Sequence, residues 1–191
     1  RALVVAALAS GTSRLTGVLD ADDTRAMIGC LRALGVAVDH DPARAVAVVT
    51  GTGGRVGGDG VVLDARMSGT TARFVLPLLS LATGEVTLDA HDAMRARPMG
   101  EAIAAVTAIG ARVDELGEPG HLPVRVRGGL PADDGGPVRL SVAGAVSSQF
   151  LSGLAMVGPC LPGGMALELV GPLVSRPYVE LTRRVMAAFG A

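Results

Sequence analysis

The stretch Leu31-Arg-Ala-Leu-Gly-Val-Ala-Val-Asp39 decides the fold, because the chain repeats it. Val106-Thr-Ala-Ile-Gly-Ala-Arg-Val-Asp114 follows the same pattern, and Val185-Met-Ala-Ala-Phe-Gly-Ala191 is a third copy. In each copy a helix stops at a glycine (Gly35, Gly110, Gly190), which takes up a left-handed backbone at no steric cost. Self-similarity of this kind is typical of a repeated structural unit. We therefore expect three related units in the 191 residues.

The helices of these copies carry apolar side chains at positions i, i+4 and i+7, which lie on one face of a helix. One face of each helix is therefore predicted to be buried. The positions are Met27, Leu31 and Leu34 in the first copy, Met99, Ile103 and Val106 in the second, and Leu181, Val185 and Ala188 in the third. Asp22 or Asp23 is the candidate N-cap of the first helix, because a carboxylate can accept a backbone N–H.

A strand and a second helix precede each amphipathic helix. The predicted strands span residues 13–19, 85–89 and 165–170, and the second helices span residues 2–9, 70–81 and 148–161. These second helices contain so few polar side chains that we expect them to be enclosed on nearly all sides. Pro77 and Pro159 are expected to bend or end two of them.

Further strands and glycine-rich turns follow the first two amphipathic helices. Strands are predicted at 45–50 and 61–64 in the first unit and at 124–126 and 138–141 in the second, with turns at 51–60 and 128–137. Neither turn has the G-x-G-x-x-G arrangement of a dinucleotide fold. The predicted fold is α/β (α+β), an inside-out α/β barrel of three βαβαββ-type repeats with buried helices and outer mixed sheets. It forms a single domain over residues 1–191.

Composition excludes several classes of function. All 17 basic residues are Arg, so the chain has neither a P-loop lysine nor a lysine for a Schiff base. A formal net charge of -1 favours neither nucleic acid nor a membrane surface as a partner. No apolar run is long enough to span a bilayer. We expect a cytoplasmic protein, and because the chain opens on Arg1 we expect the natural protein to extend upstream.

The cysteines and histidines do not form a metal site in this reading. Cys30 and Cys160 lie far apart in apolar stretches, which suits buried thiols better than a disulfide. His40, His91 and His121 have no metal-ligand spacing and are expected to be solvated.

Hydrogen-bond donors gather at the starts of the three enclosed helices. They are Arg1, the run Ser68-Gly-Thr-Thr-Ala-Arg73 and the run Ser147-Ser-Gln149. If these helices pack together, their free N–H groups and positive dipole ends favour an anion. An Arg can fork two hydrogen bonds onto a phosphate or carboxylate. Ser and Thr at such positions are equally well explained as ordinary helix caps.

Five runs resemble the 5-enolpyruvylshikimate-3-phosphate synthase family in sequence, order and spacing. They are Asp22-Asp-Thr-Arg-Ala-Met27, Ser68-Gly-Thr-Thr-Ala-Arg73, Arg97-Pro-Met99, Ser147-Ser-Gln-Phe150 and Ser175-Arg-Pro-Tyr178. The resemblance implies transfer of the enolpyruvyl group of phosphoenolpyruvate to the 5-hydroxyl of shikimate 3-phosphate, with no metal or organic cofactor. It also implies substrate-binding residues. Arg1, Ser147, Ser148, Gln149, Ser175 and Tyr178 would hold shikimate 3-phosphate, and Gly69 and Arg97 would contact phosphoenolpyruvate.

The resemblance also limits what this chain is expected to do alone. The family's acid–base residues belong largely to a second domain, which is absent from these residues, so no catalytic residue is expected here. Because the family closes two domains over its substrates, we expect no turnover without that partner domain. The whole enzyme is expected to be a monomer. Gly69 is the small residue expected in a glyphosate-sensitive site.

One departure from the family keeps other functions open. Arg66-Met67 stands where the family has Gly-Asn, so an apolar side chain replaces a compact amide donor. This change is compatible with a non-catalytic anion-binding domain of the same fold. A UDP-N-acetylglucosamine enolpyruvyl transferase is the weaker alternative, because that family lacks the Ser-Ser-Gln and Ser-Arg-Pro-Tyr runs.

Overall fold

A computed structural model describes residues 1–130, 136–143, 147–173 and 175–191. Its elements in chain order are α1 (Ala2–Leu8), β1 (Thr12–Thr16), α2 (Asp22–Ala33), β2 (Ala37–Asp41), β3 (Val46–Thr50), β4 (Val61–Asp64), α3 (Gly69–Leu78), a 3-10 turn (Leu79–Leu81), β5 (Glu85–Asp89), α4 (Asp92–Arg95), α5 (Gly100–Ile109), β6 (Arg112–Glu115), β7 (Val124–Arg127), β8 (Val138–Ala143), α6 (Ser148–Val157), a second 3-10 turn (Gly158–Cys160), β9 (Met165–Val170) and α7 (Arg176–Ala188).

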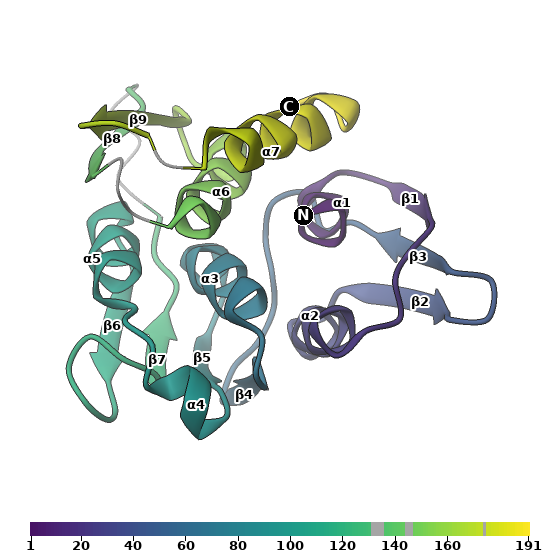
Figure 1. Ribbon diagram of the computed structural model, residues 1–191, viewed down its shortest axis with the longest axis horizontal. Coiled ribbons are helices and arrows are strands. Elements are labelled where there is room, and N and C mark those ends of the chain that lie inside the picture. The colour runs from purple at the N-terminus through teal and green to yellow at the C-terminus, as the bar shows by residue number, and fades with distance from the viewer. Residues whose placement is uncertain (131–135, 144–146, 174) are drawn as a thin grey trace.

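Three separate sheets lie around the helices, as Figure 1 shows. The first has the order β1-β3-β2 and is antiparallel throughout. The second has the order β4-β5-β7-β6, with β4 parallel to β5 and the other neighbours antiparallel. The third is the parallel pair β8-β9. The protein is therefore a mixed α/β fold in which one complete βαβαββ unit can be followed from β4 to β7.

The prediction placed two strands in the wrong units. Residues 61–64 were assigned to the first unit, but β4 pairs with β5 of the second, with Val61 opposite Val86. Residues 138–141 were assigned to the second unit, but β8 pairs with β9 of the third. In both cases a buried helix connects the two strands, and a crossover of this length is what parallel pairing requires.

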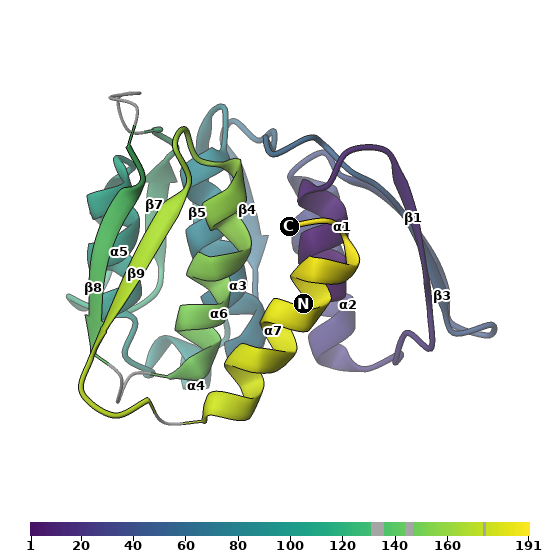
Figure 2. The same cartoon turned by 90° about the horizontal axis from the view of Figure 1, so that it is seen from above.

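Helices α1, α3 and α6 are the enclosed ones, as the sequence predicts. Residues 4–8 of α1 are buried, and in α3 every residue from Phe74 to Leu78 is buried. In α6 only Gln149 and Ala155 are partly open. Figures 1 and 2 show α3 and α6 side by side in the middle of the molecule, with α5 on one side and α1 on the other.

A close contact between backbones joins α3 to α6. Pro77 has no N–H, so the carbonyl oxygen of Arg73 cannot receive the usual helical hydrogen bond from residue 77. A Cβ atom on Gly153 of α6 would lie only 2.5 Å from that oxygen and 3.1 Å from the Pro77 ring. Gly153 therefore lets α6 approach α3 at a point where any side chain would collide with the backbone.

The amphipathic faces of α2 and α5 are confirmed, because Met27, Leu31 and Leu34 are buried, as are Met99, Ile103 and Val106. The face predicted for α7 is only partly right, because Val185 packs against the core but its two companions do not. Leu181 is 46% exposed and Ala188 is exposed, whereas the buried side is centred on Thr182. The Thr182 hydroxyl donates to Ser152 Oγ at 2.8 Å or to the Tyr178 carbonyl at 2.9 Å. A pattern of apolar residues cannot predict the burial of a polar side chain whose hydrogen bonds are satisfied inside the protein.

Other local predictions met mixed outcomes. The left-handed glycines after α2, α5 and α7 are confirmed, with positive φ at Gly35, Gly110 and Gly190. Strands β2 and β6 and helix α4 were missed. The N-cap of α2 is Ala21, with no side-chain cap, so the prediction of Asp22 or Asp23 is wrong; both lie in the first turn, where their charge suits the helix dipole.

Both cysteines are free thiols, as predicted, and Cys30 is buried. The prediction of a solvated His40 is wrong, because it lies in β2 and its Nε2 is buried without a hydrogen-bond partner. His91 is exposed, and its Nδ1 accepts from the Ala93 amide at the start of α4. No group of three metal-binding side chains occurs in the described residues, and none of the described helices could cross a membrane.

Candidate functional site

An open hollow of about 540 Å³ lies where α1, α3 and α6 begin. Side chains from these three helix starts form its walls, together with Arg97 and the first turn of α7. The lining residues are Arg1, Thr70, Arg73, Arg97, Ser147, Ser148, Gln149 and Tyr178. The structure thus brings together six of the eight predicted site residues: Arg1, Arg97, Ser147, Ser148, Gln149 and Tyr178.

Gly69 and Ser175 are the predicted residues that do not line this hollow. Gly69 lies directly beside it, because a Cβ atom there would be 2.8 Å from Arg73 Nη1 and 3.0 Å from Arg97 Nη1. A glycine at this point lets two guanidinium groups approach the start of α3. Ser175 is exposed with a φ of 57° and precedes α7 without a side-chain cap.

The hydroxyls at the helix starts divide between capping and bridging. Ser68 is buried and its Oγ accepts from the Thr71 amide at 3.0 Å, so it is a helix cap. Ser147 Oγ lies 3.4 Å from the Gln149 amide at the start of α6. Thr70 Oγ1 instead accepts from Gln149 Nε2 at 2.9 Å, which links α3 to α6.

Arg73 completes this link. Its Nη1 lies 3.3 Å from Gln149 Oε1 and 3.4 Å from the Gly69 carbonyl oxygen, so one nitrogen meets acceptors on both helices. Burial, and after it the charge of Arg97, lower the pKa of Arg73 from its usual value. An arginine so perturbed still keeps its charge at neutral pH.

Arg1, which also lines the hollow, is held by aromatic rings and a hydroxyl. Its Nε donates to Thr182 Oγ1 at 2.7 Å. Its guanidinium carbon lies 5.3 Å from the centre of the Phe74 ring and 5.8 Å from that of Tyr178, within the range of a cation–π interaction. Burial lowers the pKa of Arg1, and Tyr178 raises it to a lesser extent.

The hollow concentrates positive charge that the protein does not neutralise. In the described part of the chain Arg1, Arg73 and Arg97 form no ion pair. Arg95, in contrast, is paired with Asp89 at 2.8 Å. Guanidinium groups left together without a carboxylate favour binding of an anion, which relieves their repulsion.

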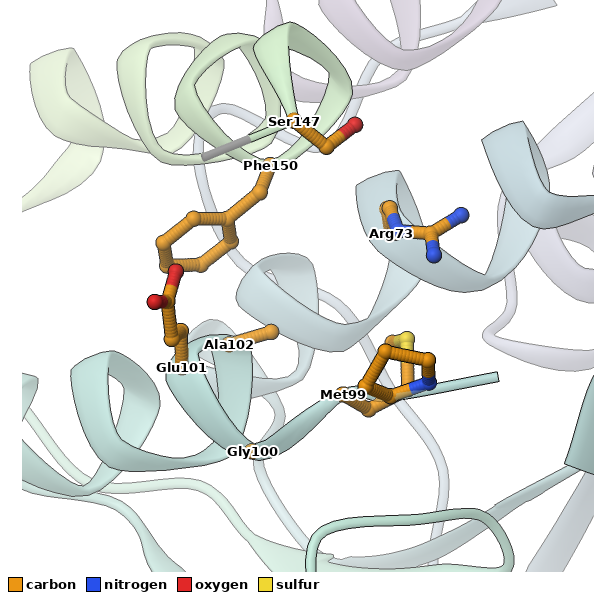
Figure 3. Close-up of a pocket in the computed structure, with 8 residues that line it drawn as sticks. Arg73, Met99, Gly100, Glu101, Ala102, Ser147 and Phe150 are labelled. Atoms are coloured by element: carbon orange, nitrogen blue, oxygen red, sulfur yellow. The ribbon is translucent and has the colours of Figure 1, made fainter. Parts of the chain in front are cut away.

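A second, smaller hollow of about 360 Å³ adjoins the first and shares Arg73 and Ser147 with it. Figure 3 shows Arg73 from α3, Met99 and Gly100 from the start of α5, and Phe150 from α6 around this space. Arg73 therefore stands in the wall between the two hollows.

Thr70 and Arg73 are the site residues to which the sequence analysis gave no individual role. Both belong to the donor-rich run at the start of α3, and their i, i+3 spacing places them on one helix face. That spacing is the signal that could have found them. Arg66 and Met67, in contrast, do not line the hollow; Met67 is 58% exposed.

Comparisons with known proteins agree with this arrangement. The family model described as EPSP synthase (3-phosphoshikimate 1-carboxyvinyltransferase) matches residues 1–191. The 3-phosphoshikimate 1-carboxyvinyltransferase of Erwinia tasmaniensis is 39% identical over 191 residues, 100% of this chain and 44% of the relative. That of Ralstonia pickettii is 40% identical over 192 residues, 100% of this chain and 43% of the relative. The chain thus spans less than half the length of these relatives.

Two solved structures show the same fold. EPSP synthase from Acinetobacter baumannii matches with a TM-score of 0.77 at 24% identity, covering 94% of this chain and 39% of that one. The enolpyruvyl transferase NikO from Streptomyces tendae matches with a TM-score of 0.70 at 19% identity, covering 99% of this chain and 41% of that one. Because the family model accounts for every residue, the chain belongs to the EPSP synthase family.

Proposed function

We propose that this chain is the substrate-binding half of a 3-phosphoshikimate 1-carboxyvinyltransferase. The complete enzyme would transfer the enolpyruvyl group of phosphoenolpyruvate to the 5-hydroxyl of shikimate 3-phosphate and release phosphate. The observation that carries the proposal is the hollow lined by Arg1, Arg73 and Arg97, none of which is neutralised by a carboxylate in the described residues. Both substrates carry phosphate and carboxylate groups, which this charge would attract.

Each substrate is assigned its own residues. Arg1, Ser147, Ser148, Gln149, Ser175 and Tyr178 would hold shikimate 3-phosphate. Gly69 and Arg97 would contact phosphoenolpyruvate. The division is supported by two proximities, because Arg1 lies against the Tyr178 ring and Arg97 lies beside Gly69.

The proposal also covers the architecture. Residues 1–191 would form a single domain, an inside-out barrel of three βαβαββ-type units, which closes on a second domain of the same enzyme. Proton-transfer groups on that second domain would meet the substrates only on closure, so this half alone would bind without turnover. The complete enzyme would act as a monomer without a metal or organic cofactor.

The test is a titration of shikimate 3-phosphate into the chain, followed by calorimetry and by tyrosine fluorescence. Tyr178 is the only tyrosine and the chain has no tryptophan, so the tyrosine emission reports on the hollow alone. We expect a saturable change in emission and at least about tenfold weaker binding of shikimate, which lacks the phosphate, equivalent to about 1.4 kcal/mol.

Two controls make the titration decisive. Arg1→Ala should weaken binding, whereas Arg112→Ala, which removes an exposed arginine paired with Asp114, should leave it unchanged. If inorganic phosphate binds as tightly as shikimate 3-phosphate, the chain is a general anion-binding domain of this fold. The exposed Met67, in place of the family's amide donor, would favour that outcome. No saturable binding would refute both functions.

A further inference from the structure

Gln149 is the only residue in the chain with a carboxamide side chain, because the sequence contains no Asn and no other Gln. It lines the larger hollow at the start of α6. A carboxamide offers a donor on one side and an acceptor on the other, so its value to a ligand depends on which way it is turned. The question is what fixes that direction.

The two neighbours of the Gln149 amide, Thr70 and Arg73, differ in whether they can accept a hydrogen bond. Thr70 has a hydroxyl, which can donate to Oε1 or accept from Nε2, so it is compatible with either direction. Arg73 has only donors, so it can meet Oε1 and never Nε2. With Arg73 Nη1 3.3 Å from Oε1, Nε2 is left facing Thr70 Oγ1 at 2.9 Å. Arg73 is therefore the neighbour that selects the orientation.

The backbone holds Arg73 in place for this task. Gln149 and Gly153 are one turn apart on the same face of α6, and Gly153 packs against the backbone oxygen of Arg73. The Arg73 side chain also reaches back to the Gly69 carbonyl oxygen. Both the main chain and the head group of Arg73 are thus fixed relative to α6.

We propose that Arg73 is a positioning residue, which turns the Gln149 amide so that its nitrogen, and not its oxygen, serves the anion hollow. One Nε2 hydrogen is donated to Thr70. The second has no partner in the described residues and is available to a phosphate or carboxylate oxygen. In the reverse orientation Oε1 would present lone pairs to the same anion and repel it. Only the identity of the ligand rests on the proposed function; the orientation does not.

Nuclear magnetic resonance can test this orientation directly. A uniformly ¹⁵N-labelled chain gives a single carboxamide pair of signals, that of Gln149. In the wild type the two Nε2 hydrogens should differ in shift, because one is bonded to Thr70 and the other is not. In Arg73→Met the amide can turn, so their separation should collapse toward that of a free glutamine, with the backbone spectrum confirming that the chain is folded.

Arg97→Met is the matched control, because it removes one positive charge from the same hollow without touching Gln149. Titration with inorganic phosphate and then with shikimate 3-phosphate separates affinity from orientation. Arg97→Met should need more ligand but reach the full shift of the Gln149 pair at saturation. Arg73→Met should lose at least about half of that shift even when saturated. Equal saturating shifts in the two variants would overturn the proposal.

A second variant keeps the test informative if Arg73→Met does not fold. Thr70→Val removes the other partner of the amide and leaves the Arg73 bond intact. If Arg73 sets the orientation, phosphate should still shift the Gln149 pair in this variant. If that response is lost, Thr70 and not Arg73 orients the amide. Should shikimate 3-phosphate fail to bind the wild type, the proposed function falls, while the ligand-free spectra still decide the role of Arg73.

Discussion

Replacing Gly153 by alanine tests the close packing of α3 against α6. The new methyl group would lie 2.5 Å from the Arg73 carbonyl oxygen, well inside van der Waals contact. Since the obstacle is backbone, relief requires the two helices to move apart. Overpacking of this kind costs about 1–3 kcal/mol, and the better helix propensity of alanine returns up to about 1 kcal/mol.

Gly29 provides the matched control, because it is also inside a helix but a Cβ atom there would meet nothing within 4 Å. Gly29→Ala should therefore show only the propensity gain and raise the free energy of unfolding by about 1 kcal/mol. The difference between the two variants isolates the overpacking cost, and we expect about 2–3 kcal/mol because a backbone carbonyl yields less than a side chain.

Urea unfolding followed by far-ultraviolet circular dichroism measures both free energies. Tyr178 fluorescence provides a second probe of the same transition. Equal changes in the two variants would show that α6 does not approach the α3 backbone as closely as described. A second consequence can be checked in the same sample. Separating the helices should also stretch the Arg73 to Gln149 contact and alter the carboxamide signals.

Three further predictions concern the site and the core. In the complete enzyme, Arg97→Ala should raise the KM for phosphoenolpyruvate more than that for shikimate 3-phosphate, and equal losses would contradict its assignment. Gly69→Ala should displace the Arg73 and Arg97 head groups and weaken phosphoenolpyruvate use about tenfold, or about 1.4 kcal/mol. Urea stability should change little, because the new methyl group meets only the ends of two long side chains and no backbone. Burial, and secondarily Asp64, raise the pKa of Cys30 from 9.0 to about 12. The Cys30 thiol therefore ionises at a lower pH in the unfolded chain than in the folded one. Its contribution to the free energy of unfolding should be fully present below pH 9.0 and should be lost as pH rises toward 12, at about 1.4 kcal/mol per pH unit. Urea unfolding across this range should show a shallower slope in Cys30→Ala, and an unchanged slope would exclude the buried thiol as its cause.

The sequence predicts best those helices and strands whose own residues indicate whether they are buried. Strands β5 and β9 have the predicted bounds, and α3 and α6 are enclosed because they contain almost no charged side chains. Strand β2 was missed because Asp39, His40 and Asp41 give it no apolar alternation; it forms through pairing with β3. Such an element depends on its partner more than on its own residues.

The sequence predicted the positive charge of the site better than the hydrogen bonds between its helices. The donor-rich helix starts indicated an anion, and six of the eight assigned residues do line one hollow. The role of Arg73 could not be read from its run, because its partner Gln149 lies 76 residues further along the chain. Likewise, the buried face of α7 depends on Ser152 of another helix, which satisfies Thr182.

The parallel pair β4-β5 separates an exposed turn from the buried helix that follows it. The chain leaves β4 and reaches α3 through residues 65–68, and α3 then crosses to β5 through the core. Met67 in that turn is exposed, and no buried apolar contact depends on it. Turns of this kind tolerate change while the scaffold beneath them stays fixed. Met67 therefore marks a position where the side chain can change with little effect on how the protein folds.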